Sequence, residues 1–361
     1  MRILHTEWIR PKGGQSLRVL EDLKIIRELG HTPLLACRPQ SWLYEEAPKR
    51  GFETFAVPFG HLADPKPYFA MLRLIRQKRV DIVHTHSSKD SYPATYAAKL
   101  LGKKVVRSRH VELTKKPGHL FRLADAVVAT GERVRDALIA AGLEPEKVVS
   151  IPTYPDPELF APSPALRREF RQKHGIGEES LVVGTMAGAG RRKRGWALPE
   201  MMIPILKARP DATLLIAGDA RGDMAENLRK KIRELGLEKR VRFVGYVRPE
   251  AFLNAIDVYA CPSEQEGLPQ ALMQAMMLGK ACVSTDVGSI AELNAEENLL
   301  LAPRDDLKRF ARHLEKVALD DALRQELGRK NRRLALERFN YDVMKEKTGE
   351  LYRRIAEGAG Q

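Results

Sequence analysis

Short apolar runs alternate with segments of helical spacing along most of the chain, and this alternation constrains the fold more than any other feature. In the first half the predicted strands are Arg2–Thr6, Pro33–Cys37, Thr54–Val57, Ile82–Thr85, Lys104–Arg107, Ala126–Ala129 and Val148–Ile151. Helical patterns lie between them, such as residues 17–29, where apolar side chains recur until Gly30 ends the turn. Strands that alternate with helices predict a parallel sheet with helices on both faces.

The alternation restarts after a proline-rich stretch, residues 151–164, which carries five prolines and is predicted to be an extended linker. The strands predicted beyond it are Leu181–Met186, Thr213–Ala217, Val241–Val244, Val258–Ala260 and Ala281–Ser284. A chain of 361 residues also suits two domains better than one. We therefore predict an α/β architecture of two doubly wound domains, residues 1–160 and 165–340, with a ligand cleft between them. A terminal helix within residues 341–361 could belong to either domain, and one possibility is that it packs back on the first.

Composition narrows the function classes. The three cysteines are far apart (Cys37, Cys261, Cys282), which excludes a disulfide framework and a cysteine-clustered metal site and indicates a reducing compartment. No apolar run reaches the length of a transmembrane helix, and the first residues do not form a signal peptide. We therefore expect a cytoplasmic protein.

The stretch with the most chemistry is PSEQEGLPQALMQAMMLGKACVSTDVGSIAEL, residues 262–293. Glu266 follows a predicted strand and a helix begins near Pro269, so free N–H groups of the first helical turn could bind a phosphate. Glu266 could accept hydrogen bonds from two hydroxyl groups, and Gln274 could reach a ribose. The spacing also suits a plain helix that Glu266 caps, with its methionines in the core.

This stretch resembles the signature of the retaining glycosyltransferases with the GT-B fold, in the glycogen-synthase-like superfamily (glycosyltransferase family 4). Their pattern is an acidic residue, Gly, an apolar residue and Pro, then a second Glu and an A-M-x-x-G run. The matching residues are Glu266, Gly267, Leu268, Pro269, Ala275, Met276 and Gly279. Gln274 replaces the second Glu. Its neutral amide could still hydrogen-bond a ribose hydroxyl, but without the additional strength that a charged carboxylate gives. This form is most similar to bacterial transferases of lipopolysaccharide core and related envelope glycans.

The resemblance extends through the first domain. Gly13 and Gly14 follow the first strand, where the family has a glycine loop that faces the donor phosphates and the acceptor. The segment DIVHTHSSKDSYPA, residues 81–94, resembles the family's D-V-V-H-x-H strand ending and implies that His86 and Ser87 face the acceptor, while His84 stays within the strand.

Two further segments of the first domain match. RSRHVE, residues 107–112, places His110 where the family's histidine reaches the donor sugar or its phosphate. Thr130 and Gly131 match a strand–helix unit that faces the donor, although they could equally be a helix cap.

At the start of the second domain, VVGTMAGAGRRKRGW lies where the family has G-R-L-x-x-x-K-G, whose Arg and Lys neutralise the diphosphate. Gly188 stands at the Arg position here, and the basic residues are Arg191, Arg192, Lys193 and Arg194. Either Lys193 or Arg194 matches the family Lys. Such a cluster suits a diphosphate, but it could also be a solvated basic turn.

The segment FVGYVRPE, residues 243–250, resembles the loop that holds the nucleotide base by backbone contacts, with Tyr246, Val247 and Arg248 nearest the base. Side chains therefore do not identify the base. Glu292 resembles an acidic residue that fixes its own loop. The resemblance implies a nucleoside-diphosphate sugar as donor, a glycolipid or oligosaccharide as acceptor, and catalytic roles for Glu266, His110 and Lys193.

No D-x-D-like pair follows a strand in the predicted cleft, so we expect a metal-independent enzyme without a cofactor. A dinucleotide dehydrogenase is disfavoured because Gly188, Gly190 and Gly195 lack the G-x-G-x-x-G spacing. A sugar-nucleotide epimerase of the same fold is the nearer alternative, although it would need further carboxylates. A nucleic-acid binder would explain the net charge of +14, but aromatic residues are only 6% and do not interleave with the basic ones.

Most of the net charge lies in residues 61–123, with fourteen Lys and Arg against four Asp and Glu. Within residues 67–79, Phe69, Leu72 and Ile75 alternate with Arg73, Arg76, Lys78 and Arg79. This pattern predicts a basic amphipathic helix suited to an anionic membrane surface, or equally a solvated helix face. The first reading would place the protein at the inner face of the cytoplasmic membrane.

Overall fold

The computed structural model describes residues 1–358, which divide into two compact units. The first unit is Met1–Thr153 together with the described chain after Tyr341, and the second is Tyr154–Tyr341.

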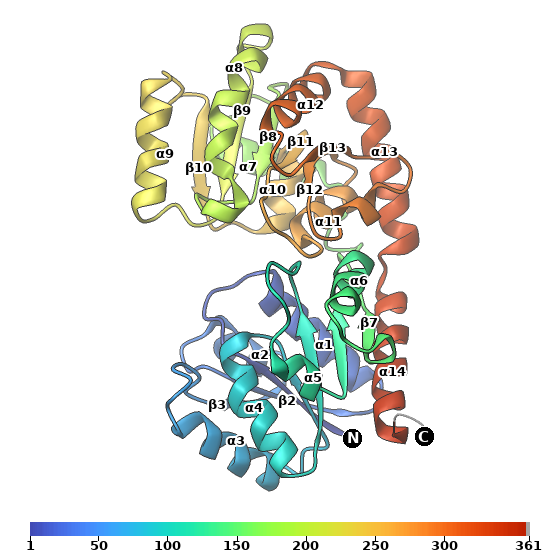
Figure 1. Ribbon diagram of the computed structural model, residues 1–361. Helices are drawn as coiled ribbons and strands as arrows, with labels where there is room; N and C mark the ends of the chain where they lie inside the picture. Colours follow the sequence, from blue (N-terminus) through green and yellow to red (C-terminus); the bar gives the residue numbers. More distant parts are fainter. Residues whose placement is uncertain (359–361) are drawn as a thin grey trace. The chain divides into compact units, whose positions relative to one another are not determined.

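The first unit contains a seven-stranded sheet in which every neighbouring pair is parallel, in the order β3-β2-β1-β4-β5-β6-β7 (Figure 1). Its strands are β1 (Arg2–Glu7), β2 (Thr32–Cys37), β3 (Glu53–Ala56), β4 (Ile82–Thr85), β5 (Lys104–Arg109), β6 (Ala126–Ala129) and β7 (Val148–Ser150). Its helices are α1 (Gly14–Glu28), α2 (Trp42–Lys49), α3 (Lys66–Gln77), α4 (Ser88–Leu100), α5 (His119–Leu123), α6 (Glu132–Ala140), the short η1 (Pro145–Lys147) and α14 (Tyr341–Glu357).

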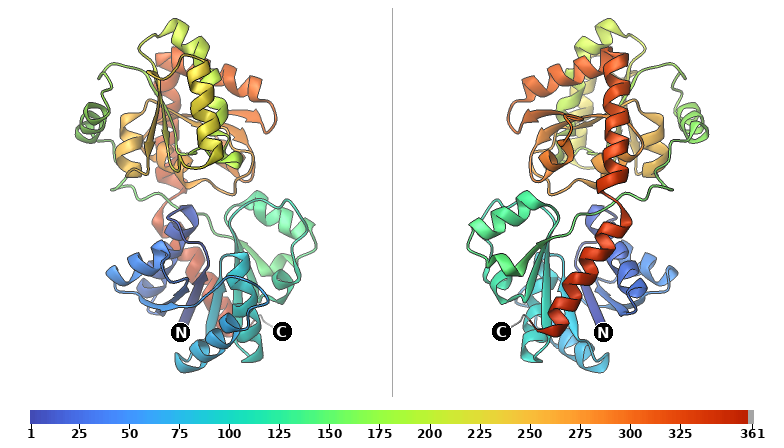
Figure 2. Two further views of the ribbon diagram at one scale, coloured as in Figure 1. Left: turned by 90° about the vertical axis from the view of Figure 1, so that its left-hand side faces the viewer. Right: turned by 90° about the vertical axis from the view of Figure 1, so that its right-hand side faces the viewer.

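Alternating side chains of β1 show how helices cover both faces of this sheet. Leu4 packs with the buried residues of α3 and α4, whereas His5 faces Tyr352 of α14 on the opposite face. The helix α14 (red in Figure 2) lies beside α1, since Lys345 pairs with Glu28 at 2.9 Å. The terminal helix therefore packs on the first unit.

The second unit repeats this architecture with six parallel strands in the order β10-β9-β8-β11-β12-β13. They are β8 (Val182–Thr185), β9 (Thr213–Ala217), β10 (Val241–Gly245), β11 (Val258–Cys261), β12 (Ala281–Asp286) and β13 (Leu300–Pro303). The helices are α7 (Pro164–Lys173), η2 (Arg191–Lys193), η3 (Gly195–Ala197), α8 (Leu198–Ala208), α9 (Asp223–Glu234), α10 (Pro249–Ala255), α11 (Gln270–Met277), η4 (Ile290–Asn294), α12 (Leu307–Leu319) and α13 (Asp321–Arg338).

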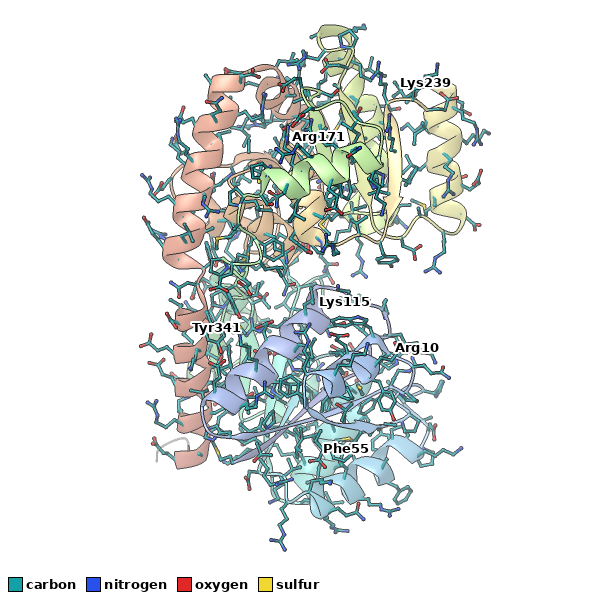
Figure 3. All side chains as sticks on the ribbon, turned by 180° about the vertical axis from the view of Figure 1, so that it is seen from behind. Arg10, Phe55, Lys115, Arg171, Lys239 and Tyr341 are labelled. Atoms are coloured by element: carbon teal, nitrogen blue, oxygen red, sulfur yellow. The ribbon has the colours of Figure 1, made fainter. Side chains whose placement is uncertain are left out.

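A buried arginine anchors the start of the second unit. Arg171 of α7 (labelled in Figure 3) pairs with Asp257 at 2.9 Å and donates to the backbone carbonyl of Ala255, also at 2.9 Å. Asp257 in turn accepts from the backbone N–H of Val182 at 2.8 Å. Because the guanidinium and the carboxylate satisfy each other and the backbone, α7 is fixed to β8 and to the loop before β11.

All twelve predicted strands are present, with bounds shifted by at most two residues. The structure adds β13, whose sequence is LLAP and which is not among the predicted strands.

The predicted amphipathic helix corresponds to α3, but most of its apolar residues serve the core. Ile75 is fully buried and Leu72 packs partly buried against the same cluster, so only Phe69 of the three predicted apolar side chains faces solvent, at 70% exposure. None of the described helices is long and apolar enough to cross a bilayer.

Candidate functional site

The loop between β11 and α11 presents the carboxylate of Glu266 from a nearly buried position. Glu266 is 6% exposed, and its Oε1 accepts hydrogen bonds from Lys193 Nζ at 2.5 Å and from Ser263 Oγ at 2.8 Å. The N-cap of α11 is Pro269, whose side chain makes no cap hydrogen bond. Glu266 forms an ion pair with Lys193, while Met273, Met276 and Met277 are buried in the core, as the plain-helix alternative also expects.

Backbone contacts fix this loop against the loop after β12. The N–H of Ser289 donates to the carbonyl of Gly267 at 2.8 Å. Gly288 has φ +56°, and a Cβ built there would lie 2.4 Å from the carbonyl oxygen of Glu266. Only glycine fits this position, because it combines a left-handed backbone with a close approach.

Lys193 and Arg194, which are neighbours in the chain, have different partners in the structure. Lys193 ends η2, and partial desolvation tends to lower the pKa of its amine, but the Glu266 carboxylate raises that pKa above its ordinary value overall. Arg194 adopts φ +50° and donates to the carbonyl of Arg304 at 2.5 Å and to Asp305 at 3.1 Å. Lys193 is therefore the cation beside Glu266, and Arg194 holds its own loop in place.

Arg192 and Gly188 complete the loop after β8. The carbonyl of Arg192 accepts from the N–H of Glu264 at 2.7 Å, which joins this loop to the one that carries Glu266. Gly188 has φ +56°, and a Cβ there would lie 2.8 Å from the carbonyl oxygen of Asp219. The packing explains why no arginine stands at position 188, since any side chain would meet the backbone after β9.

The other predicted residues of the second unit lie in or just before α11 and in the loop after β10. Gln274 is nearly buried within α11, and Leu268 is buried in the core. Tyr246, Val247 and Arg248 form the loop after β10, which two strands, β9 and β8, separate from β11. Within that loop Tyr246 is 65% exposed, and Val247 packs against the core.

In the first unit, a pocket of about 350 Å³ lies where β1, β4 and β5 end. Three predicted residues, His86, Ser87 and His110, line it. Gln15 of α1 also lines it, directly after Gly13 and Gly14, and Gly13 is the N-cap of that helix. The structure therefore brings the two histidines and Ser87 together, with the glycine loop adjacent in the chain.

Hydrogen-bonded histidines run from the pocket into the core. His110 Nε2 lies 3.1 Å from His86 Nδ1, and His86 Nε2 lies 2.8 Å from His5 Nδ1. The Tyr352 hydroxyl then joins His5 Nε2, at 3.1 Å, to His84 Nδ1, at 2.7 Å. Burial and then the charge of Arg18 lower the pKa values of His5 and His110 to about 3, so the rings are neutral at physiological pH.

Two buried carboxylates lie beneath this pocket. Glu7 accepts from Ser87 Oγ and from Gln15 Nε2, both at 2.6 Å, and Asp90 accepts from Thr6 Oγ1 at 2.6 Å. Burial raises the pKa of Glu7, and burial followed by the charge of Glu7 raises that of Asp90 well above its usual range. These bonds fix Ser87 at the rim of the pocket.

Sequence reasoning missed His5, Glu7, Gln15 and Tyr352. One signal could have found His5, because the chain repeats a motif in ILHT (residues 3–6) and IVHT (residues 82–85). These segments are adjacent strands in register, with His5 opposite His84. No local pattern marks Tyr352, which is far away in the sequence.

His5, His84 and His86 could also hold a metal ion, since one ring nitrogen from each lies within 4.8 Å of the others. Their nitrogens already bond to one another, to Tyr352 and to Ser108.

The predicted residues Thr130 and Gly131 lie between β6 and α6. Gly131 is the N-cap of α6, and the hydroxyl of Thr130 is buried without a hydrogen-bond partner in the described chain.

Comparisons with known proteins divide the chain in the same way. Residues 12–159 match the family model "Glycosyltransferase Family 4", and residues 167–334 match "Glycosyl transferases group 1". The lipopolysaccharide core biosynthesis mannosyltransferase LpsB of Rhizobium meliloti is 31% identical over 196 residues, 52% of this chain and 54% of that protein. An Escherichia coli UDP-Gal:alpha-D-GlcNAc-diphosphoundecaprenol alpha-1,3-galactosyltransferase is 25% identical over 81% of this chain and 80% of its own. The match thus spans about half of the first relative.

Solved structures share the whole architecture. The Anabaena protein HepE, in complex with UDP and glucose, has a TM-score of 0.85 at 21% identity and covers 98% of this chain and 99% of its own. WaaG, a glycosyltransferase involved in lipopolysaccharide biosynthesis, has a TM-score of 0.73 at 16% identity and covers 97% and 99%. At these identities the likeness is one of fold, and it confirms the predicted GT-B fold class.

Proposed function

Because the chain belongs to the GT-B glycosyltransferases, with a family 4 domain followed by a group 1 domain, we propose that it transfers a sugar from a nucleoside-diphosphate sugar to an envelope glycan or glycolipid, with retention of configuration. The observation that carries this proposal is the Lys193–Glu266 ion pair, held by backbone contacts just before the N-terminus of α11. It offers a cation for a diphosphate and a carboxylate for sugar hydroxyls within one loop cluster.

Each group has a chemical role in this proposal. Glu266 accepts hydrogen bonds from hydroxyls of the donor sugar. Lys193 and the first N–H groups of α11 stabilise the charge that develops on the leaving diphosphate, which is the costly part of the step. Gln274 and the loop of Tyr246, Val247 and Arg248 bind the nucleoside, with Arg192 and Arg194 supporting the diphosphate loop. His110 positions the sugar or its phosphate.

The transfer itself needs no dedicated base. The bond between the anomeric carbon and the diphosphate oxygen breaks, and the acceptor hydroxyl forms a new bond to that carbon from the same face. The proton of the hydroxyl passes to the departing phosphate oxygen. Retention follows because attack and departure share one face.

We propose that no metal ion takes part, since Lys193 and the helix N-terminus already supply positive charge for the diphosphate. Turnover of the donor in buffer with EDTA should equal turnover with Mg²⁺ or Mn²⁺. A rate that disappears with the chelator and returns with the divalent ion would contradict the proposal.

The donor base can be determined by ligand-induced stabilisation. HepE binds UDP and the E. coli relative is named for UDP-Gal, which favours uridine. At equal concentrations, UDP should raise the Tm of the protein more than GDP, ADP or CMP, because a ligand that binds only the folded state stabilises it by mass action. The corresponding UDP-sugars would then be assayed for transfer. If none of the four nucleotides changes the Tm, the proposed function fails.

An envelope acceptor also implies work at a membrane surface, on the cytoplasmic side. Phe69 of α3 and Leu100 of α4 are exposed on two helices that pack together, and exposed Arg73 and Arg76 lie near Phe69 on α3. The protein should co-sediment with phosphatidylglycerol-containing vesicles and not with phosphatidylcholine alone, and Phe69→Ser should weaken the binding. Equal sedimentation with both vesicle types would contradict an electrostatic surface interaction.

A further inference from the structure

The pocket of the first unit contains a buried cation, two of whose nitrogens have no hydrogen-bond partner in the described chain. Arg107 lies on β5, is only 8% exposed and lines the pocket. Its Nε and Nη1 find no hydrogen-bond partner among the described residues. Burial lowers the pKa of Arg107 to about 10, so the guanidinium stays charged at neutral pH.

Such an arrangement costs stability unless something else bonds to these donors. Buried N–H groups without partners lose their hydrogen bonds to water, and charged groups lose more than neutral ones. The guanidinium carbon lies 4.2 Å from the centre of the Phe121 ring, which supports the flat face of the group but bonds to none of its N–H donors. The edge of the fork is therefore available for a planar or tetrahedral oxyanion.

Other groups that line the pocket also favour an anion. Arg109 and Lys89 also line it, and Arg109 is held in place by bonds to the carbonyls of Val111 at 2.8 Å and Glu112 at 2.7 Å. The first turn of α4 contributes Ser88 to the lining, and a helix N-terminus favours anions. The carboxylates below, Glu7 and Asp90, already accept hydrogen bonds from Ser87, Gln15 and Thr6.

We propose that this pocket binds a phosphate group of the acceptor, with the Arg107 guanidinium as its buried contact and Arg109 and Lys89 as supporting cations. The assignment of this phosphate to the acceptor rests on the proposed function, whereas the phosphate site itself does not. Selection of phosphorylated over neutral acceptors would follow, because a neutral acceptor leaves the Arg107 donors without partners.

Inorganic phosphate is the probe, titrated at constant ionic strength. The titration is made with saturating UDP present and repeated in a Lys193→Ala background, so that binding beside Lys193 does not contribute. Phosphate should raise the Tm of the wild type by about 2–4 °C, as expected for millimolar affinity. In Arg107→Met the apparent Kd should weaken at least tenfold, and in Arg107→Lys it should weaken less. The matched control, Arg122→Met on exposed Arg122 of the same unit, should respond as the wild type.

A second measurement tests a purely structural role. Without phosphate, Arg107→Met should change the Tm by only a few degrees, because the loss of the attraction between Arg107 and buried Asp90 is offset by the removal of a buried cation with unpaired donors. An equal phosphate response in wild type and Arg107→Met, or a large loss of stability in that variant, would overturn the inference. If UDP fails to bind but the Arg107-dependent phosphate response persists, the phosphate site stands and the proposed function falls.

Discussion

Glu266→Ala should lower kcat/KM for glycosyl transfer by about 10²–10³-fold, or roughly 2.7–4 kcal/mol of transition-state stabilisation. The carboxylate is nearly buried and is aimed by Lys193 and Ser263, so its acceptor oxygens are already oriented before the sugar binds. Removing it also leaves Lys193 without its partner in the loop. Initial rates over a range of donor concentrations give the measurement, and the loss should fall mainly on kcat.

Two further variants make this result specific. Glu264→Ala removes a half-buried carboxylate two residues away, for which the described chain shows no side-chain bond, and should keep activity within about twofold. Glu266→Gln keeps one acceptor oxygen but loses the charge, so it should lie between the wild type and Glu266→Ala. Near-wild-type turnover of Glu266→Ala would remove this residue from the site.

Lys193→Ala should lower kcat by about 10²-fold, because the ammonium group would stabilise charge that grows on the diphosphate as the glycosidic bond breaks. Lys193→Arg should recover part of the rate, since the charge remains but the shape of the group changes. Single-turnover rates separate this chemical effect from weaker donor binding.

The neighbouring arginines provide the controls. Arg191→Ala removes an exposed cation from the same short helix and should leave kcat within about twofold. Arg194→Ala should instead lower the Tm, because Arg194 bonds to the carbonyl of Arg304 and to Asp305. If Arg194→Ala lost as much kcat as Lys193→Ala without loss of stability, the assignment of Lys193 would be wrong.

Local patterns predicted most of the fold because they reflect local physics. In a sheet buried on both faces, strands are short continuous apolar runs, and each of the twelve predicted runs is a strand. The missing strand, β13, contains only LLAP, and its pairing with β12 depends on a neighbour that its own composition does not reveal. For Glu266, its place in the loop after a strand indicates the ligand-binding edge of a parallel sheet but leaves a plain helix open, and its proposed role rests on the resemblance of residues 262–293 to the glycosyltransferase signature.

The rest of the site depends on contacts distant in sequence. The choice between Lys193 and Arg194 is decided by residues 266 and 304, so no local pattern could make it. Arg107 reads as one more basic residue of a basic segment, and only its burial beside Phe121 distinguishes it. Likewise, His5 and His84 are joined through the hydroxyl of Tyr352, which lies near the other end of the sequence.

The return of α14 to the first unit has a consequence for synthesis on the ribosome. Domains usually fold in the order in which they emerge, N-terminal first. Here Tyr352, whose hydroxyl bridges His5 and His84, leaves the ribosome after the whole second unit. The second unit is one continuous stretch that needs nothing from the chain after Tyr341. The unit that is begun first is therefore completed last, and a chain truncated before α14 would keep the whole second unit but lack the tyrosine that joins His5 to His84.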